Sequence, residues 1–248
     1  MCARSFFIQS WWNFEGMQNL GFLFGLDPWL HRIYPDPEEY RRAALRHLEF
    51  FNTQPYMVSF ALGLVGAMEE QRAAAPEAAR PAIEERIRQL KRVAGSSLAA
   101  IGDSFFWGAL KPACAAMTIL TWLVLWTAGV SHPLAWGALA YLVAYNVPAV
   151  WIRWKGLRMG YYFGEQLPAE LKKLRWQSKT RWTRRVGLCA ASALALACLI
   201  VPPFGGTPGL KGAAALAAAL GLRSLGVSTM RLYAGAAALG LLLALVRP

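Results

Sequence analysis

An uncharged stretch of 18 residues, Ala113–Val130, is the feature that most restricts what this chain can fold into. A helix needs about 20 apolar residues to cross a bilayer core, where an irregular backbone cannot satisfy its hydrogen bonds. Leu134–Ile152 is a second uncharged stretch, set off by Ser131, His132 and Pro133, and Gly187–Phe204 is a third. The pattern predicts an all-α, polytopic helical membrane protein with several transmembrane helices in its C-terminal half.

Composition supports a membrane protein and argues against nucleic-acid binding. Charged residues make up 16% of the chain, hydrophobic ones 56%, and the mean hydropathy is +0.31, whereas soluble domains carry about 25% charged residues. The net charge of +12 is concentrated beside apolar stretches, as in "KKLRWQSKTRWTRR" at 172–185. This pattern is typical of cytoplasmic loops and of contact with anionic lipids. Lys111 before the first pair of spans and Arg153 after it place both ends in the cytoplasm, with His132 at the outside tip.

Two regions are expected along the chain. Residues 1–112 combine interfacial helices with broken or re-entrant ones, and residues 113–248 form the transmembrane region, with a basic cytoplasmic segment at 165–186. Met57–Ala67 is too short to span a bilayer and is expected to be a broken helix inside the fold. Gly212–Leu222 and Leu232–Val246 are also too short to be comfortable crossings.

Three polar clusters lie beside apolar stretches, and their residue types suit a sugar. Amides offer donors and an acceptor, carboxylates accept from paired hydroxyls, and aromatic rings cover the C–H faces of a pyranose. No catalytic set, metal-ligand spacing or phosphate-binding glycine loop is recognised, so no cofactor and no metal are expected. The clusters are His47, Glu49, Asn52, Thr53 and Gln54; Glu69 and Glu70; and Asp103 with Trp107.

Each of these residues also has a structural interpretation. His47 can be a hydrogen-bonding residue within the fold, and the two glutamates can be solvated groups at an apolar-to-polar boundary. Asp103 can cap the N-terminus of a helix that starts there. Asn52 and Gln54 can satisfy backbone groups where a helix ends before a proline.

The stretches "HLEFFNTQPY", "EEQ" and "IGDSFFWG" together resemble the membrane subunit IID of the mannose/fructose/sorbose family of the sugar phosphotransferase system (PTS). The later segment "YNVPAVWIRWKGLRMGYYFG" is similar as well, and the resemblance covers about residues 4–166.

The resemblance implies a transport subunit that carries no phosphoryl-transfer residues of its own. Such a subunit forms the translocation path with a second membrane subunit, IIC, as a trimer of IIC–IID pairs in the bacterial cytoplasmic (inner) membrane, which it crosses several times. The substrate is a hexose or an amino sugar, phosphorylated by subunit IIB, which is supplied by IIA.

The resemblance also suggests roles for the motif residues. Asn52, Gln54 and Glu70 are expected to bind sugar hydroxyls, Trp107 to provide a ring platform, and Asp103 to support the site. The residues expected at the substrate are Asn52, Thr53, Gln54, Glu69, Glu70, Asp103 and Trp107, and those expected to shape the motifs are His47, Glu49, Pro55 and Gly102.

Two positions depart from the family pattern. Ser97 and Ala100 stand where the family's "GPLAGIGDSIFWG"-like stretch has a proline and a glycine, which alters backbone freedom beside the expected site. The departures, with the basic cytoplasmic block, leave an alternative: a regulatory or scaffolding subunit that docks PTS proteins without transporting sugar.

Overall fold

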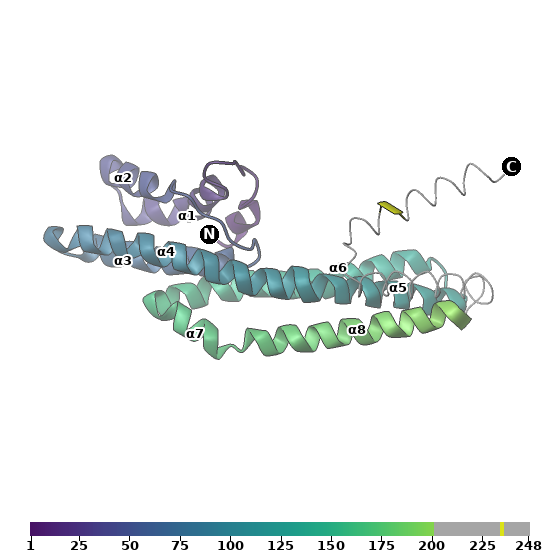
Figure 1. Ribbon diagram of the computed structural model, residues 1–248. Helices are drawn as coiled ribbons and strands as arrows, with labels where there is room; N and C mark the ends of the chain where they lie inside the picture. Colours follow the sequence, from purple (N-terminus) through teal and green to yellow (C-terminus); the bar gives the residue numbers. More distant parts are fainter. Residues whose placement is uncertain (201–233, 236–248) are drawn as a thin grey trace. The chain divides into compact units, whose positions relative to one another are not determined.

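The computed structural model describes residues 1–200 and residues 234–235 (Figure 1). The chain divides into two compact units, Met1–Ala190 and Ala191–Pro248, and the account below concerns the first. Its described elements are helical, apart from isolated bridges that join Asn13 to Met17 and Met17 to Phe51. In order they are η1 (Ala3–Phe7), α1 (Asn19–Ile33), α2 (Pro37–His47), α3 (Val58–Ala74), η2 (Glu77–Ala79), α4 (Arg80–Gly102), η3 (Asp103–Leu110), α5 (Lys111–Thr127), α6 (Pro133–Phe163), η4 (Gly164–Gln166), α7 (Leu167–Lys173) and α8 (Trp176–Ile200).

Helix α2 has side-chain and proline signals at its N-terminus. The carboxylate of Asp36 accepts a hydrogen bond from the backbone N–H of Glu39 at 2.9 Å, and Pro37 occupies the first turn. Both features stabilise a helix N-terminus. The helix ends at His47, so Phe51 lies outside it in the loop that leads to α3.

Helix α3 is the central helix of the unit. From Val58 to Met68 it is apolar on every side apart from Ser59, and it is buried along most of its length, which is expected of a helix surrounded by other helices. The expected break near Ala67 is absent, because the helix continues to Ala74. It does so past Glu69, whose buried charge pairs with Arg46 and His47 of α2.

Glycines bring the backbones of α3 and α6 together. A Cβ at Gly160 would overlap the carbonyl oxygen of Phe60, and a Cβ at Gly63 would overlap that of Leu157. At Gly156 a Cβ would lie 2.6 Å from Cδ2 of the Phe60 ring. Small residues permit close packing of this kind between helices.

Two helical stretches are long and apolar enough to cross a membrane, Glu77–Thr127 and Pro133–Lys173. Within each stretch, an 18-residue apolar segment is mostly unburied: 33% of it is buried in the first stretch and 22% in the second. Most of these surfaces therefore face outward. The third expected span, Gly187–Phe204, coincides with the end of α8 as far as Ile200, and its remainder lies outside the described residues. The short apolar pieces at 212–222 and 232–246 also lie outside them, except for residues 234–235.

No break separates α4, η3 and α5. The helix is continuous across the boundary expected after Pro112, and the middle segment, η3, is π-helical. Asp103 therefore lies inside a helix, and the interpretation of this residue as an N-cap is wrong.

Candidate functional site

Glu69 on α3 lies at the centre of a buried ion cluster. Its carboxylate accepts hydrogen bonds from Arg46 Nη2 at 2.8 Å, His47 Nε2 at 2.9 Å and the Tyr34 hydroxyl at 2.7 Å. Glu69 and His47 are fully buried, and Arg46 is 7% exposed. The hydrogen-bonding interpretation of His47 agrees with this geometry, and the solvated-boundary interpretation of Glu69 does not.

The cluster extends through Arg72 and ties four helices together. Arg72 pairs with Glu39 of α2 at 2.9 Å and with Glu84 of α4 at 2.8 Å. Arg46 also approaches Glu84, at 3.3 Å. Buried charges cost several kcal/mol each unless they are paired. The network therefore fixes how α1, α2, α3 and α4 meet, and it occupies both oxygens of Glu69.

The pKa values of Glu69 and His47 are both lowered in the folded protein. Burial alone raises the pKa of the Glu69 carboxyl, but its hydrogen bonds with His47 and Arg46 and the Arg46 charge lower that pKa to about 2. Complete burial lowers the pKa of His47 below its usual value of 6.5. His47 is therefore neutral and donates its Nε2–H to Glu69.

We expect stability to decline on acidification. Below pH 6.5 the unfolded chain protonates His47 while the folded protein does not, so the free energy of unfolding falls. Below about pH 4.5 the unfolded chain also protonates Glu69 while the folded protein keeps it ionised, so the free energy of unfolding falls further. Thermal unfolding of the detergent-solubilised protein between pH 7.5 and pH 4 measures this. A midpoint that stays constant across this range contradicts the assignment.

The loop between α2 and α3 is held by Thr53. Its backbone N–H donates to Gln18 Oε1 at 3.0 Å, its carbonyl accepts from Gln18 Nε2 at 2.9 Å, and its hydroxyl donates to the Gly95 carbonyl at 3.0 Å. These bonds dock the loop on α1 and α4. Sequence reasoning missed Gln18, because an amide ahead of a helix gives no sign of a partner 35 residues away.

Gln54 packs directly against Gly102. A Cβ at position 102 would lie 2.5 Å from Cβ of Gln54, so this glycine allows the loop to approach α4. Gln54 Oε1 accepts from the backbone N–H of Tyr56 at 2.7 Å, in agreement with the backbone-satisfying interpretation. Its Nε2 is buried and has no partner among the described residues.

Aromatic rings pack around Tyr56, whose backbone N–H donates to Gln54. Tyr56, which sequence reasoning missed, lies 4.6 Å from the Phe106 ring, 6.1 Å from Trp107 and 5.8 Å from Tyr145, measured between centroids. Trp107 remains 41% exposed, and Asp103, also in the π-helical segment, is exposed. Such segments are rare and are often found at functional sites. Gln54 and Trp107, predicted from separate motifs, are thus in one neighbourhood.

Glu70 is not part of this neighbourhood. It accepts a hydrogen bond from the Tyr161 hydroxyl at 2.6 Å, about 18 Å along α3 from Val58 at the helix start. Asn52 is exposed, Pro55 is half-buried, and Glu49 pairs with Arg88 at 3.0 Å on the surface. The structure therefore does not assemble all the predicted sugar contacts around one point.

Arg153 is a buried cation that the sequence analysis assigned to a cytoplasmic flank. It is 4% exposed, donates to the Ser5 carbonyl at 2.6 Å, and stacks over Tyr56 at 5.2 Å. It forms no ion pair within the described part of the chain. Its Nε lacks a partner there, as do Ser59 Oγ and the Tyr145 hydroxyl. Arg153 follows an apolar run, a position where a cation usually lies at the membrane surface. Nothing in the sequence therefore indicated that it is buried.

These features define an all-helical membrane protein with a polar and aromatic neighbourhood beside Tyr56. Among the described residues, no group of three His, Cys, Asp or Glu side chains is placed to hold a metal ion. The model of the PTS system mannose/fructose/sorbose family IID component matches residues 1–201, and the chain belongs to this family.

Curated relatives and a solved structure agree. The chain is 35% identical over 193 residues to the mannose-specific EIID component of Escherichia coli K12, covering 77% of this chain and 64% of that protein. It is 32% identical to the sorbose-specific EIID component of Lacticaseibacillus casei, over 73% and 60%. The chain thus spans a little less than two thirds of these relatives. A structure of the mannose transporter ManYZ with microcin E492 matches with a TM-score of 0.57 and 28% identity, over 97% of this chain and 92% of that one.

Proposed function

We propose that this chain is a IID subunit that forms, with a IIC membrane subunit, the translocation path for a hexose or amino sugar. Transport is coupled to phosphorylation by IIB, supplied by IIA. The observation that supports this most is the family match over residues 1–201, together with the likeness to a chain of a mannose transporter. The proposal includes a trimer of IIC–IID pairs, crossing the bacterial inner membrane several times and contacting anionic lipids, with no nucleic-acid partner.

Within this function, we assign the sugar contact to the neighbourhood of Gln54 and Trp107. Gln54 has a free buried donor and Trp107 an exposed ring, which are the two elements that sugar recognition needs. Thr53 and Glu69 have their polar groups occupied by the fold, so they position the loop and the helices. Asn52, Asp103 and Glu70 are exposed or half-buried, which leaves them to face the sister subunit.

Uptake of labelled mannose tests this assignment in cells that supply the cognate IIC, IIB and IIA but lack their own IID. Gln54→Ala should lower the initial rate about tenfold, because a buried hydrogen bond to a hydroxyl contributes about 1.4 kcal/mol. Trp107→Ala should raise the sugar concentration needed for half-maximal uptake. Glu49→Ala, which removes only an exposed pair with Arg88, is the control and should transport normally.

Two results would contradict the proposal. Normal uptake by both Gln54→Ala and Trp107→Ala would show that the site is assigned wrongly. An unaltered chain that moves none of the usual hexoses yet retains IIB binding would favour the scaffolding alternative, which the departures at Ser97 and Ala100 raised.

A further inference from the structure

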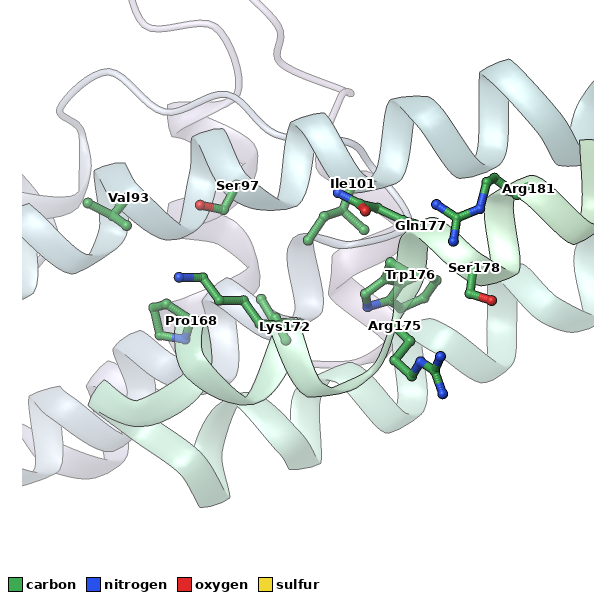
Figure 2. A pocket seen from close by; sticks show the side chains of 11 residues that line it. Val93, Ser97, Ile101, Pro168, Lys172, Arg175, Trp176, Gln177, Ser178 and Arg181 are labelled. Carbon is green, nitrogen blue, oxygen red and sulfur yellow. The ribbon is translucent and has the colours of Figure 1, made fainter.

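A pocket of about 630 Å³ lies between α4, α7 and the first turns of α8. Figure 2 shows Lys172 at one end of it and Arg181 at the other, with Trp176 and Gln177 between them. Ser97 and Ile101 of α4 form the facing wall. The volume is in the range that holds a small organic ligand.

A second cavity, of about 410 Å³, adjoins the first. It shares Ile101, Trp176, Gln177 and Arg181 with the pocket and adds Arg184. Nη2 of Arg184 is also the nearest side-chain atom to the position a Cβ would take at Gly108, at 3.8 Å. The two cavities together form a groove along α8 that is lined by both cations and apolar side chains.

The cations of this groove have no acidic neighbour within it, because neither cavity is lined by an aspartate or a glutamate. Lys172, Arg181 and Arg184 are exposed and form no ion pair with any described residue. Elsewhere, Arg46, Arg72 and Arg88 are paired, and even the adjacent Lys173 bonds to Glu170 at 2.5 Å. Unpaired cations over a partly apolar surface attract an anion that can accept several hydrogen bonds.

Neutral donors complete the set. Ser97 and Ser178 offer hydroxyls and Gln177 an amide. Trp176 contributes its ring to the wall between these donors. A phosphate group carries acceptor oxygens in several directions, so it can use donors arriving from both α4 and α8. The apolar wall at Val93 and Ile101 suits a carbon portion attached to that phosphate.

We propose that this groove is a binding site for a phosphate group carried on a small organic molecule. Two sources share this chemistry: the headgroup of an anionic phospholipid and a water-soluble phosphate ester. The first would place the groove at the cytoplasmic headgroup level, since the uncharged run from Gly187 follows directly. The proposal stands apart from sugar translocation, because the groove contains neither Gln54 nor Trp107.

Binding to the purified full chain in uncharged detergent tests the proposal. Native mass spectrometry measures retention of phosphatidylglycerol against phosphatidylcholine, and titration calorimetry measures glucose 6-phosphate and inorganic phosphate. We expect at least one phosphate-bearing probe to bind. The double variant Lys172→Gln/Arg181→Gln should weaken that binding about tenfold or more, because it removes two charge-assisted donors. Binding of the lipid alone or of the soluble ester alone supports the proposal and identifies the source.

The matched control is Lys173→Gln/Arg185→Gln, which removes the same charge from the same segment without touching the groove. It should bind like the unaltered protein. Equal weakening by the two double variants would show attraction to net charge alone and would overturn the proposal. Failure of every phosphate-bearing probe to bind would overturn it as well. Thermal unfolding of each variant excludes misfolding as the cause, since all four side chains are exposed.

Discussion

Glu69→Gln is expected to destabilise the protein by about 3 kcal/mol or more. The amide fills the same space as the carboxylate, yet it leaves the charge of Arg46 buried with Glu84 as its remaining partner, at 3.3 Å. In the unaltered protein both carboxylate oxygens of Glu69 accept hydrogen bonds. Glutamine replaces one of these oxygens with an NH2 group, which then faces another donor. The midpoint of thermal or denaturant unfolding in detergent measures the loss.

Glu70→Gln is the matched control for this prediction. Glu70 is the next residue on α3, is half-buried and has one hydrogen bond, from Tyr161, which an amide oxygen can still accept. We expect its unfolding midpoint to stay close to that of the unaltered protein. Equal effects of the two substitutions would contradict the role assigned to the ion cluster.

Gly160→Leu is expected to separate α3 from α6 and to prevent normal folding. Any side chain at this position meets the carbonyl oxygen of Phe60, which belongs to helix backbone and cannot rotate away. Inserting extra carbon atoms into a packed core commonly costs about 1–3 kcal/mol, and a backbone clash should exceed this. Recovery of monodisperse protein after detergent extraction, followed by its unfolding midpoint, measures the effect.

Gly108→Ala serves as its control. The atom nearest to a Cβ there is the Asp103 carbonyl oxygen at 3.5 Å, an ordinary contact. Alanine should therefore be tolerated, with a gain of up to about 1 kcal/mol from the higher helix propensity. A Gly160→Leu protein as stable as this control would show that the two helices do not meet as described.

The all-helical membrane class could be predicted from sequence because long uncharged runs have few alternatives in a bilayer. The continuity of the helix through Asp103 could not be predicted, because an acidic residue after a glycine is also typical of a helix N-terminus. Likewise, Met57–Ala67 read as a broken helix because Glu69 was counted as a polar boundary. Its partners, Arg46 and His47, come from another helix, and no local pattern reveals them.

The candidate site was predictable in part, for a related reason. Gln54 and Trp107 stood out as polar or aromatic residues in unusual settings, and both contact Tyr56 in the structure. Glu70 stood out in the same way but lies farther along α3, since sequence spacing does not say where a helix ends. Arg153 was overlooked because its burial depends on η1, which packs over it through Ser5 and Phe6.

The unbroken helical stretch from Glu77 to Thr127 has a mechanical consequence. At 51 residues it is roughly 75 Å long, and it carries Glu84 of the ion cluster near one end and the apolar span near the other. A rod of this length converts a small tilt at its bilayer end into a displacement of many ångströms at its opposite tip.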